Sequence, residues 1–383
     1  MKLIIAHTID PDTAHAAEEL IRIAREKLGG MRPSAGLIYT ALDFDHAALT
    51  ARLCEEFEGV DLVGCTTDGE LSGDTGFHED SVVLILFASE QITIRAGLGR
   101  NLSADPDAAV REAIAMATEP GDPTPSLCIT LPDGLTSSGS TITIALLEAL
   151  GGTVPLVGGM SADQHQYQEC WQLFNGEVVQ DTVPLLLFYG PLSVGIGQAS
   201  GWKPVGRSVE VTEADGNIIR RIGEQTAVAF YQNYFGDHIR LNPEYPLIVS
   251  EADRETAYLR SPLRPIEGGA IQFAGDIPEG ASVRIGEASR SAIIEACAES
   301  IRSAQASMIG AQSLDGILVF SCAARRMVLG TRTPQEIAIL REAVPLVPIG
   351  GFYSYGEIAP AKHGEAAQFH NETFITILLA ETS

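Results

Sequence analysis

The sequence predicts an α/β protein with two α/β domains, each a mixed β-sheet flanked by helices, related by internal duplication. Strand and helix patterns alternate through the first half of the 383 residues. Short strands, glycine and proline turns and further helices fill the second half. A strand–turn–strand motif near the beginning of the chain recurs near its end, at residues 64–81 and 351–373.

In the first half, short apolar runs predict strands, and capping residues mark the helix starts. The run SVVLILFA at 81–88 is typical of a central strand buried on both faces, and the alternating run at 91–99 is expected to pair beside it. Asn175-Gly176 predicts a tight hairpin turn. The other strand candidates are 2–8, 36–42, 60–71, 126–131, 154–163, 169–174, 178–190, 193–202 and 205–219, and the helix candidates are 13–28, 44–57, 105–118, 138–150 and 224–236.

The second half begins after a linker at Gly236–Pro246, which predicts domains at residues 1–235 and 236–383. Its strands are expected to be short and separated by glycine or proline turns. The strand candidates are 246–250, 256–264, 268–275, 281–286, 315–322, 344–351 and 374–380, and the helix candidates are 288–308 and 334–343.

The composition excludes several classes of partner. A net charge of −25 opposes binding to nucleic acid and to anionic membrane surfaces. No stretch has the roughly 18 apolar residues that a membrane span needs, and the N-terminal apolar run is too short for a signal peptide. The six cysteines are scattered without a CxxC or metal-like spacing, which indicates reduced thiols in a cytoplasmic protein.

The repeated motif has the spacing G-x4-G-E. Gly64-Cys-Thr-Thr-Asp-Gly-Glu70 matches Gly351-Phe-Tyr-Ser-Tyr-Gly-Glu357, and both follow an apolar strand. Each is followed by a second match, FHEDS from residue 77 and FHNET from residue 369, that opens another apolar strand. A weaker third echo is PLVGG at 155–159. Duplication explains these ordered matches, and convergence of common strand–turn–strand chemistry is the alternative.

The C-terminal copy of the motif carries the main candidate site. On one strand, Tyr353, Tyr355 and Glu357 would share a face, because side chains alternate with a period of two. His370 and Asn371 would reach the end of this row if FHNETF pairs beside it. A buried glutamate needs donors, and these would be Arg325 or a ligand amino group. The rival interpretation is a closed structural network. Cys65, Thr66 and Glu70 are the corresponding candidates in the first copy.

At these residues the chain resembles the FIST family, whose members have an N-terminal and a C-terminal FIST domain. The most specific matching stretches are GFYSYGEI and FHNET, and together the matches sample nearly the whole chain in the order of the family. The others are VGCTTDGEL, VPLVGGMSADQHQYQECWQLFNGEVV, SGWKPVGRSVEVTEADGNII and DGILVFSCAARR.

The resemblance implies a non-catalytic, intracellular sensory protein in signal transduction. Its ligand would be an amino acid or a similar small metabolite. The resemblance also implies that the signal passes to a separate partner chain, such as a histidine kinase, a nucleotide cyclase or a chemoreceptor. Some family members bind haem and sense nitric oxide, and a haem sensor is therefore an alternative. His165 is then the first candidate for the axial ligand and His370 the second.

An enzyme acting on a small polar metabolite is the other alternative. Cys65 and Cys322 would be the nucleophiles, with His78 and His370 as bases, although core packing explains both cysteines more simply. No G-x-S-x-G, HExxH or Walker A motif is present, and PDGLTSSGST lacks the lysine of a phosphate-binding loop. The dispersed histidines predict no metal site, and no cofactor is expected.

Overall fold

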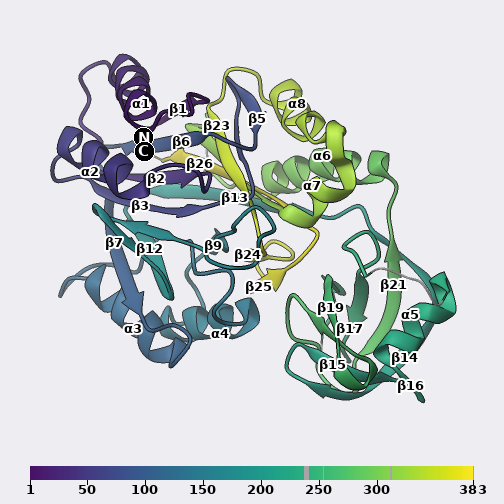
Figure 1. Cartoon of the computed structure of the whole chain (residues 1–383). Helices are drawn as coiled ribbons and strands as arrows, with labels where there is room; N and C mark the ends of the chain where they lie inside the picture. The colour runs from purple at the N-terminus through teal and green to yellow at the C-terminus, as the bar shows by residue number, and fades with distance from the viewer. Residues whose placement is uncertain (237–240, 253, 311–312, 383) are drawn as a thin grey trace.

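The computed structural model describes residues 1–236, 241–252, 254–310 and 313–382. It confirms the mixed α/β class, with sheets that combine parallel and antiparallel pairs and are flanked by helices. Residues 1–202 and 288–382 form a body that contains three six-stranded sheets. Residues 203–287 form a separate lobe, seen at the lower right of Figure 1, around a fourth sheet.

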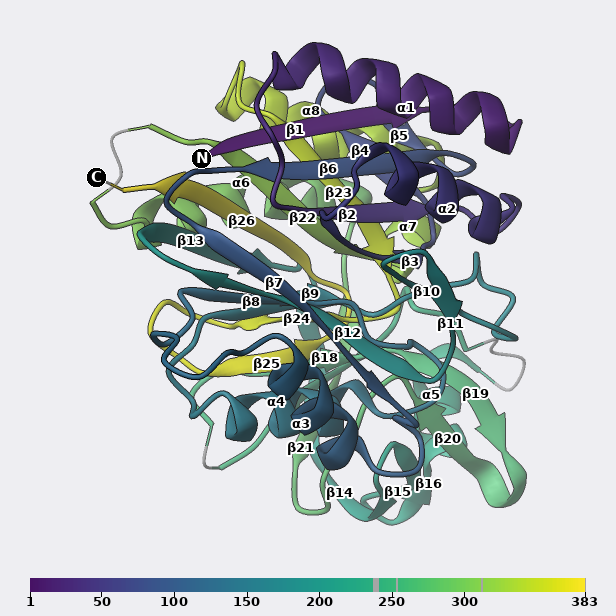
Figure 2. The ribbon, with the colours of Figure 1, turned by 90° about the vertical axis from the view of Figure 1, so that its left-hand side faces the viewer.

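The body is built from three units with one order of elements, in which a strand, helix, strand, helix and strand precede a short hairpin and a closing strand. In each unit the second and third strands pair in parallel, and the closing strand lies between the first and second strands. Figure 2 shows this order for the first unit, from β1 through β6, β2 and β3. The first unit comprises β1 (Lys2–Thr8), α1 (Thr13–Leu28), β2 (Ala35–Thr40), α2 (His46–Glu56), β3 (Asp61–Thr66), β4 (Glu70–Ser72), β5 (Gly76–His78) and β6 (Val82–Ala88).

The second and third units repeat this plan, and the third unit carries the lobe between its first strand and its first helix. The second unit comprises β7 (Thr93–Arg100), α3 (Pro106–Met116), β8 (Leu127–Thr130), α4 (Gly139–Ala149), β9 (Leu156–Gly159), β10 (Gln172–Phe174), β11 (Glu177–Val179) and β12 (Thr182–Tyr189). The third comprises β13 (Leu192–Ala199), α6 (Arg290–Ser307), β22 (Gly316–Cys322), α7 (Ala323–Leu329), α8 (Pro334–Ala343), β23 (Ile349–Ser354), β24 (Glu357–Pro360), β25 (Ala367–His370) and β26 (Phe374–Glu381).

The hairpin of each unit leaves its own sheet and extends the sheet of another unit. The hairpin β4–β5 pairs with β23, β10–β11 with β3, and β24–β25 with β9. The exchange is cyclic, so each of the three six-stranded sheets of the body contains strands from two units. Three backbone hydrogen bonds close the same ring, from Asp68 N to Tyr353 O (2.9 Å), from Tyr355 N to Met160 O (3.3 Å) and from Ala162 N to Thr66 O (2.9 Å).

Helices cover the outer face of each sheet. Buried residues of α1 and α2 pack on β6 and β2, those of α3 and α4 pack on β8 and β12, and those of α6 and α8 pack on β22 and β26. Asp12 caps α1 by accepting a hydrogen bond from His15 N, and Gly29 ends the helix with a φ of 61°, which gives the predicted helix bounds of 13–28.

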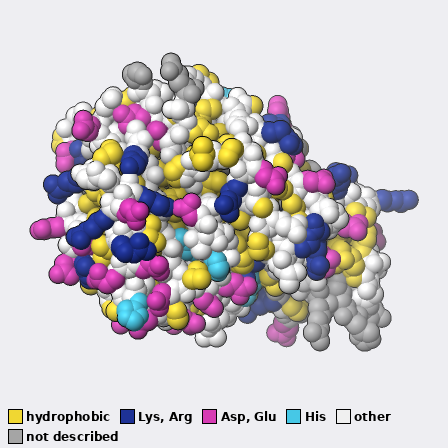
Figure 3. Space-filling model, turned by 90° about the horizontal axis from the view of Figure 1, so that it is seen from above, with side chains coloured by type: hydrophobic (Ala, Val, Ile, Leu, Met, Phe, Trp, Pro, Cys, Tyr) yellow, Lys and Arg dark blue, Asp and Glu magenta, His cyan; other side chains and the backbone are white. Residues whose placement is uncertain are grey.

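The surface carries both signs of charge. Figure 3 shows lysine and arginine interspersed with aspartate and glutamate over the face seen from above. Among the described residues, no helix is long and apolar enough to cross a membrane.

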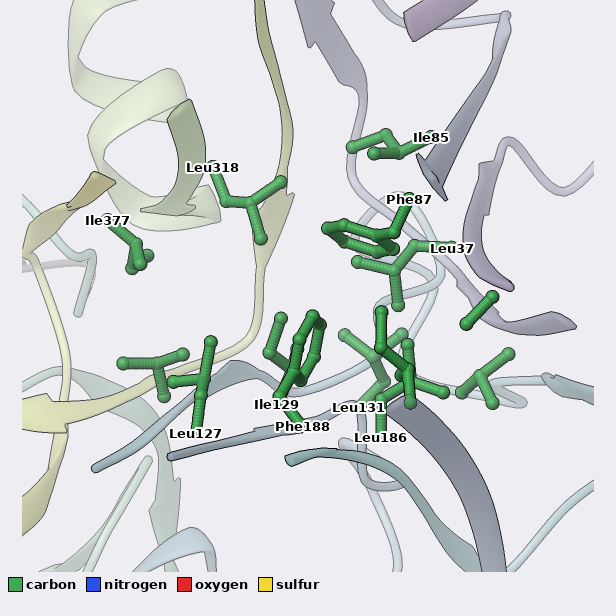
Figure 4. Packing of buried hydrophobic residues seen from close by; sticks show 14 of the residues in the cluster. Leu37, Ile85, Phe87, Leu127, Ile129, Leu131, Leu186, Phe188, Leu318 and Ile377 are labelled. Atoms are coloured by element: carbon green, nitrogen blue, oxygen red, sulfur yellow. The ribbon is translucent and has the colours of Figure 1, made fainter. Parts of the chain in front are cut away.

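One central core joins the inner faces of the three sheets. It combines Leu37 and Phe87 of the first unit with Phe188 of the second and Leu318 of the third (Figure 4). The rings of Phe87 and Phe188 meet edge to face, with their centroids 5.2 Å apart. The residues of β6 alternate between this core and the outer one, so SVVLILFA is a central strand buried on both faces, as predicted.

The lobe is mostly antiparallel sheet. The first and last strands of the lobe pair with each other. Their pairing begins with Lys203 opposite Glu287, where the chain passes from the body into the lobe and back. The elements are β14 (Lys203–Asp215), β15 (Ile218–Ile222), β16 (Gln225–Thr226), α5 (Ala227–Phe235), β17 (Leu247–Ser250), β18 (Tyr258–Arg260), β19 (Pro262–Ile266), β20 (Ala270–Phe273) and β21 (Ser282–Glu287).

Two local predictions were wrong, and one helix was missed. Strand β7 does not pair beside β6 but joins β12 in another sheet, because the turn after Ala88 carries the chain to the second unit. Residues 344–348 are not a strand, since Pro345 and Pro348 lack backbone donors, and β23 begins at Ile349. Helix α7 was not predicted, because its seven residues are too few to show a helical period.

The predicted repeat occurs three times rather than twice. Residues 61–88 and 349–381 share one topology, and residues 156–189 share it as well. Shared descent of the units remains a prediction. The predicted linker 236–246, of which 237–240 lie outside the described residues, connects α5 to β17 inside the lobe. The domain boundary after residue 235 also stays a prediction.

Candidate functional site

The G-x4-G-E motif is the point where the chain crosses from one sheet to the next. Glu70 begins β4 and Glu357 begins β24, each at the first residue of the exchanged hairpin. Gln172 begins β10 at the equivalent position of the second unit. Gly69 has a φ of 118°, which requires glycine at this bend. The residues paired across the new sheets are Phe352, Gly159 and Cys65, respectively.

Both glutamates of the motif are completely buried and hydrogen-bonded by hydroxyl groups. Glu357 accepts from Ser354 Oγ at 2.8 Å and from Thr373 Oγ1 at 2.7 Å. Glu70 accepts from Ser81 Oγ at 2.6 Å and from the Thr67 hydroxyl. Burial raises the pKa of each carboxyl to about 8, so most molecules carry both in the neutral form at pH 7.

The second unit makes the same contacts with an uncharged side chain. Gln172 Nε2 donates to Ser161 Oγ at 2.9 Å, and Thr182 Oγ1 donates to Gln172 Oε1 at 3.0 Å. An amide therefore fills the position that Glu70 and Glu357 fill in the other units. The position requires a polar, hydrogen-bonded group but no charge.

Tyr353 and Arg325 belong to a separate buried network centred on Glu336. Tyr353 Oη donates to Glu336 Oε2 at 2.5 Å, and Arg325 Nη2 lies 2.6 Å from Glu336 Oε1. The expected contact between Arg325 and Glu357 is absent from the described structure, because Arg325 lies on α7 and reaches toward α8. Ser354 and Thr373 supply the donors to Glu357 instead.

The expected row of Tyr353, Tyr355 and Glu357 does not form, because the chain turns between β23 and β24 into another sheet. Tyr355 lies at this turn. Its hydroxyl donates to Asp163 Oδ1 at 2.5 Å, and its ring stacks on Tyr167 with centroids 5.0 Å apart. Of the FHNETF segment, only Phe369 and His370 belong to β25, and His370 lies opposite Glu357 in the ladder of β24 and β25.

A polar cluster that the sequence did not suggest lies beside Tyr355. Asp68 is fully buried, with Arg326 Nε 2.7 Å from Oδ2 and His165 Nδ1 2.8 Å from Oδ1. Asp163 holds the loop through the backbone N–H groups of Tyr167, Gln168 and Glu169. These residues come from three units, so no local spacing in the sequence could have identified them.

The candidate ligand site is a pocket of about 330 Å³ between body and lobe, called here the inter-lobe pocket. His370 and Thr373, from the predicted FHNET segment, line its body side. Trp202 and Tyr258 line it with aromatic rings. The volume lies in the range of small-ligand sites. The remaining lining residues are Gln198, Ala199, Ser200, Gly201, Lys203, Thr256, Ala257, Leu259, Glu299 and Ala361.

The inter-lobe pocket offers charge and hydrogen-bonding capacity. Lys203 and Glu299 line it and have no side-chain partner among the described residues. Thr256 Oγ1 is buried and has no hydrogen-bond partner among the described residues. His370 Nε2 lies 2.9 Å from Ala359 O, and burial lowers the pKa of His370 to about 4, which keeps the imidazole neutral.

Asn371, Thr66 and Cys65, three further predicted site residues, are not among the residues that line the inter-lobe pocket. Asn371 is buried next to His370, and its Oδ1 has no hydrogen-bond partner among the described residues. Thr66 Oγ1 accepts from Trp171 N at 3.0 Å within the ring of sheets. Cys65 is part of the central core, and burial raises the pKa of its thiol well above the usual value. A ligand role for the predicted residues stays a prediction.

The thiols do not favour nucleophilic chemistry. All six cysteines are free in the structure. Burial raises the pKa of Cys322 as well as that of Cys65, whereas a nucleophile needs a lowered pKa.

The surroundings of the histidines do not fit haem. The His165 ring lies beside the carboxyl group of Asp68 and the rings of Tyr167 and Tyr355, a polar setting rather than the apolar one that a haem plane needs. The Nε2 atom of His370 already faces Ala359 O.

Comparison with known proteins gives several matches. Two uncharacterized proteins, one from each of two Mycobacterium tuberculosis strains, are 23% identical over 96% of this chain and 98% of their own length. An uncharacterized protein of Methanocaldococcus jannaschii is 24% identical over 47% of this chain, and the match spans only 36% of that protein. A solved cyanuric acid hydrolase from A. caulinodans covers 100% of this chain and 99% of its own with a TM-score of 0.37 and 10% identity, a likeness too weak to establish shared fold or activity.

Family models match almost the whole chain. The FIST N domain matches residues 34–225, and the FIST C domain matches residues 227–360. Domains of this family are associated with signal transduction and small-ligand sensing. The chain belongs to the FIST family, with its N domain followed by its C domain.

Proposed function

We propose that this protein is a sensor that binds a small zwitterionic metabolite, such as an amino acid, in the inter-lobe pocket. The observation that carries the proposal is that Lys203 and Glu299, which have no side-chain partner among the described residues, line one pocket of about 330 Å³. Lys203 would bind the carboxylate of the ligand, and Glu299 would bind its ammonium group. Trp202 and Tyr258 would contact the apolar part.

The position of the pocket supports a signalling role. Its walls come from the body and from the lobe, so a ligand that contacts both stabilises one arrangement of the two. We propose that a separate chain, such as a histidine kinase, a nucleotide cyclase or a chemoreceptor, reads this arrangement. Catalysis receives no support from the buried, high-pKa thiols.

A thermal-shift screen of amino acids and their decarboxylated and deaminated analogues tests the proposal. A ligand at a hundredfold excess over its Kd should stabilise the folded protein by about 2.7 kcal/mol. Lys203→Ala and Glu299→Gln should each weaken the response to a zwitterion at least about tenfold, as expected for a lost charge-assisted bond.

Two exposed residues outside the pocket provide matched controls. Glu295 lies one turn before Glu299 on α6, and Arg111 lies on α3. Glu295→Gln and Arg111→Ala should leave the response unchanged. Equal responses of the pocket variants and the controls would refute the assignment of this pocket.

A further inference from the structure

The contact between body and lobe contains a buried acid that neither the candidate site nor the proposed function uses. Glu372 lies just before β26 of the body, and none of its surface is exposed. Its Oε1 accepts a hydrogen bond from the hydroxyl of Ser261, which belongs to the lobe. Its Oε2 is buried and has no hydrogen-bond partner among the described residues. The acid therefore joins body and lobe while one of its two oxygens stays unsatisfied.

The repeated plan of the body shows the same position without a lobe over it. In each unit an acid directly precedes the hydroxyl residue that bonds to the first residue of the exchanged hairpin. In the first unit this acid is Asp80, which is exposed, and in the second it is Asp181, which is partly exposed. Asp181 and Glu372 also share a backbone conformation, with φ values of 55° and 60°. Only the third unit carries the lobe, so the lobe accounts for the burial of Glu372.

The surroundings of Glu372 hold no free positive charge among the described residues. Arg325 Nη1 donates to the backbone carbonyl of Glu372 at 3.4 Å, but its guanidinium is ion-paired with Glu336. Glu357 faces the acid from β24 and opposes a second negative charge. The other titratable groups nearby have raised pKa values and stay neutral up to pH 8, namely Tyr231 of α5, Cys322 of β22 and Tyr167 of the loop before β10.

The protonation of Glu372 differs between a docked and a separated lobe. Burial raises the pKa of Glu372 from 4.5 to about 8, and Glu357 adds to the rise. With the lobe lifted, the acid would meet water as Asp80 does and return to an ordinary pKa. Between the two values the docked state keeps a proton that the separated state has lost. The ratio of docked to separated molecules is therefore highest below pH 4.5 and falls up to about tenfold per pH unit until pH 8.

We propose that Glu372 is a proton-controlled latch, which in its protonated form holds the lobe on the body through Ser261 and on ionisation weakens that hold. An ionised carboxylate would be enclosed between body and lobe with Oε2 unpartnered, and separation admits the water that it lacks.

The other contacts between lobe and body do not titrate in this range. Arg260 Nη1 donates to Phe369 O at 3.2 Å, and burial lowers the pKa of Arg260 only to about 10, so it keeps its charge. Leu259 of the lobe packs with Ile293 of the body in an apolar cluster. These contacts set the strength of the joint, and Glu372 makes that strength depend on pH. The latch needs no ligand in the inter-lobe pocket, and neither does its test.

Native-state thiol labelling of the full-length protein measures how often the lobe separates. Leu259→Cys places a thiol in the apolar cluster between lobe and body. Its labelling rate, divided by the rate in the urea-unfolded chain at the same pH, gives the opening equilibrium at this position. Peptide mass spectrometry distinguishes this thiol from the native ones. Cys65, in the central core, reports in the same sample on opening of the body itself.

Opening at position 259 should exceed opening at Cys65 and should rise about fifty-fold from pH 6 to pH 8. Glu372→Gln in the same background should remove most of this rise, because the amide accepts from Ser261 but does not titrate. Ser261→Ala should raise opening at both pH values at least about threefold and keep the rise. Asp80→Asn, at the same position of the first unit, is the matched control and should change neither.

A rise that persists in Glu372→Gln would overturn the proposal, and so would opening at position 259 that does not depend on pH in the Leu259→Cys protein. Labelling there no faster than at Cys65 would have the same meaning, since the lobe would then separate only when the body unfolds. Circular dichroism establishes that each variant is folded.

Discussion

Glu70 and Glu357 are buried acids whose raised pKa has a definite effect on stability. With a pKa of about 8 in the folded state, each keeps its proton between pH 4.5 and 8, where the unfolded chain has lost it. The unfolded state therefore binds fewer protons, and stability falls as pH rises through this window. The slope from each group is at most about 1.4 kcal/mol per pH unit.

Glu357→Gln tests this account. The new amide should adopt the contacts of Gln172, donating to Ser354 and accepting from Thr373. We expect a change in unfolding free energy within about 1 kcal/mol at pH 5 and relative stabilisation at pH 8, because the proton linkage is removed. Urea titrations at both pH values measure this, and a loss of several kcal/mol at pH 5 would show that the carboxyl itself is required.

Glu336→Gln, in contrast to Glu357→Gln, should strongly destabilise the folded protein. Glu336 is the only carboxylate ion-paired with Arg325 among the described residues, and neither side chain is exposed. Removing its charge leaves the guanidinium buried and uncompensated, which should cost about 3–5 kcal/mol. Glu342→Gln, at an exposed position of the same helix, is the control and should change chemical denaturation little. Similar midpoints for the two variants would contradict the argument.

At the scale of elements, the crossover from β23 to β24 depends on close packing at Gly356. A Cβ there would lie 2.2 Å from the ring of Phe369. Gly356→Ala should therefore destabilise the protein by about 1–3 kcal/mol through overpacking. Gly73→Ala is the matched control, since its Cβ would make only an ordinary contact, at 3.4 Å to Ile349. Thermal unfolding measures the melting temperatures of both variants. Equal melting temperatures would contradict the close packing of Gly356 against Phe369.

At the scale of the whole molecule, the exchanged hairpins bind the units together. Fragment 1–235 would lack β26, the partner of β13, and β24, the partner of β9. Fragment 236–383 would lack β13 and β4. We expect neither fragment to fold alone and the two to assemble when co-expressed, as judged by circular dichroism and gel filtration. A cooperative unfolding transition in either isolated fragment would contradict this expectation.

Local features of this fold could be predicted from the sequence, and long-range ones could not. Asp12 and Gly29 mark the ends of α1, and Asn175 and Gly176 adopt φ values of 48° and 90° in the predicted hairpin. These features depend on neighbouring residues. The exchange of hairpins depends on which sheet a strand joins, which neither periodicity nor turn chemistry encodes.

The residues of the candidate site likewise divide into those that the sequence could suggest and those that it could not. His370, one of the predicted site residues, lines the inter-lobe pocket without Tyr353, Tyr355 or Glu357, whereas Lys203 and Glu299 were not predicted. They are exposed charges on elements far apart in sequence, and single exposed charges are common on any surface. Tyr353 and Glu357 have a conspicuous sequence context, but their polar groups are satisfied inside the body.

The attachment of the lobe has a mechanical consequence. The two strands that join it to the body pair with each other from Lys203 and Glu287 onward, and therefore form a short ribbon. This ribbon is one attachment among several. Arg260 Nη1 of the lobe donates to Phe369 O of the body at 3.2 Å, and the Ser261 hydroxyl donates to Glu372. Ile248 and Leu259 of the lobe also pack with Ile293 of the body in one buried cluster. Lys203 begins the ribbon and lines the inter-lobe pocket, so a ligand bound there would add one more fastening to a joint that is already clamped on its other sides.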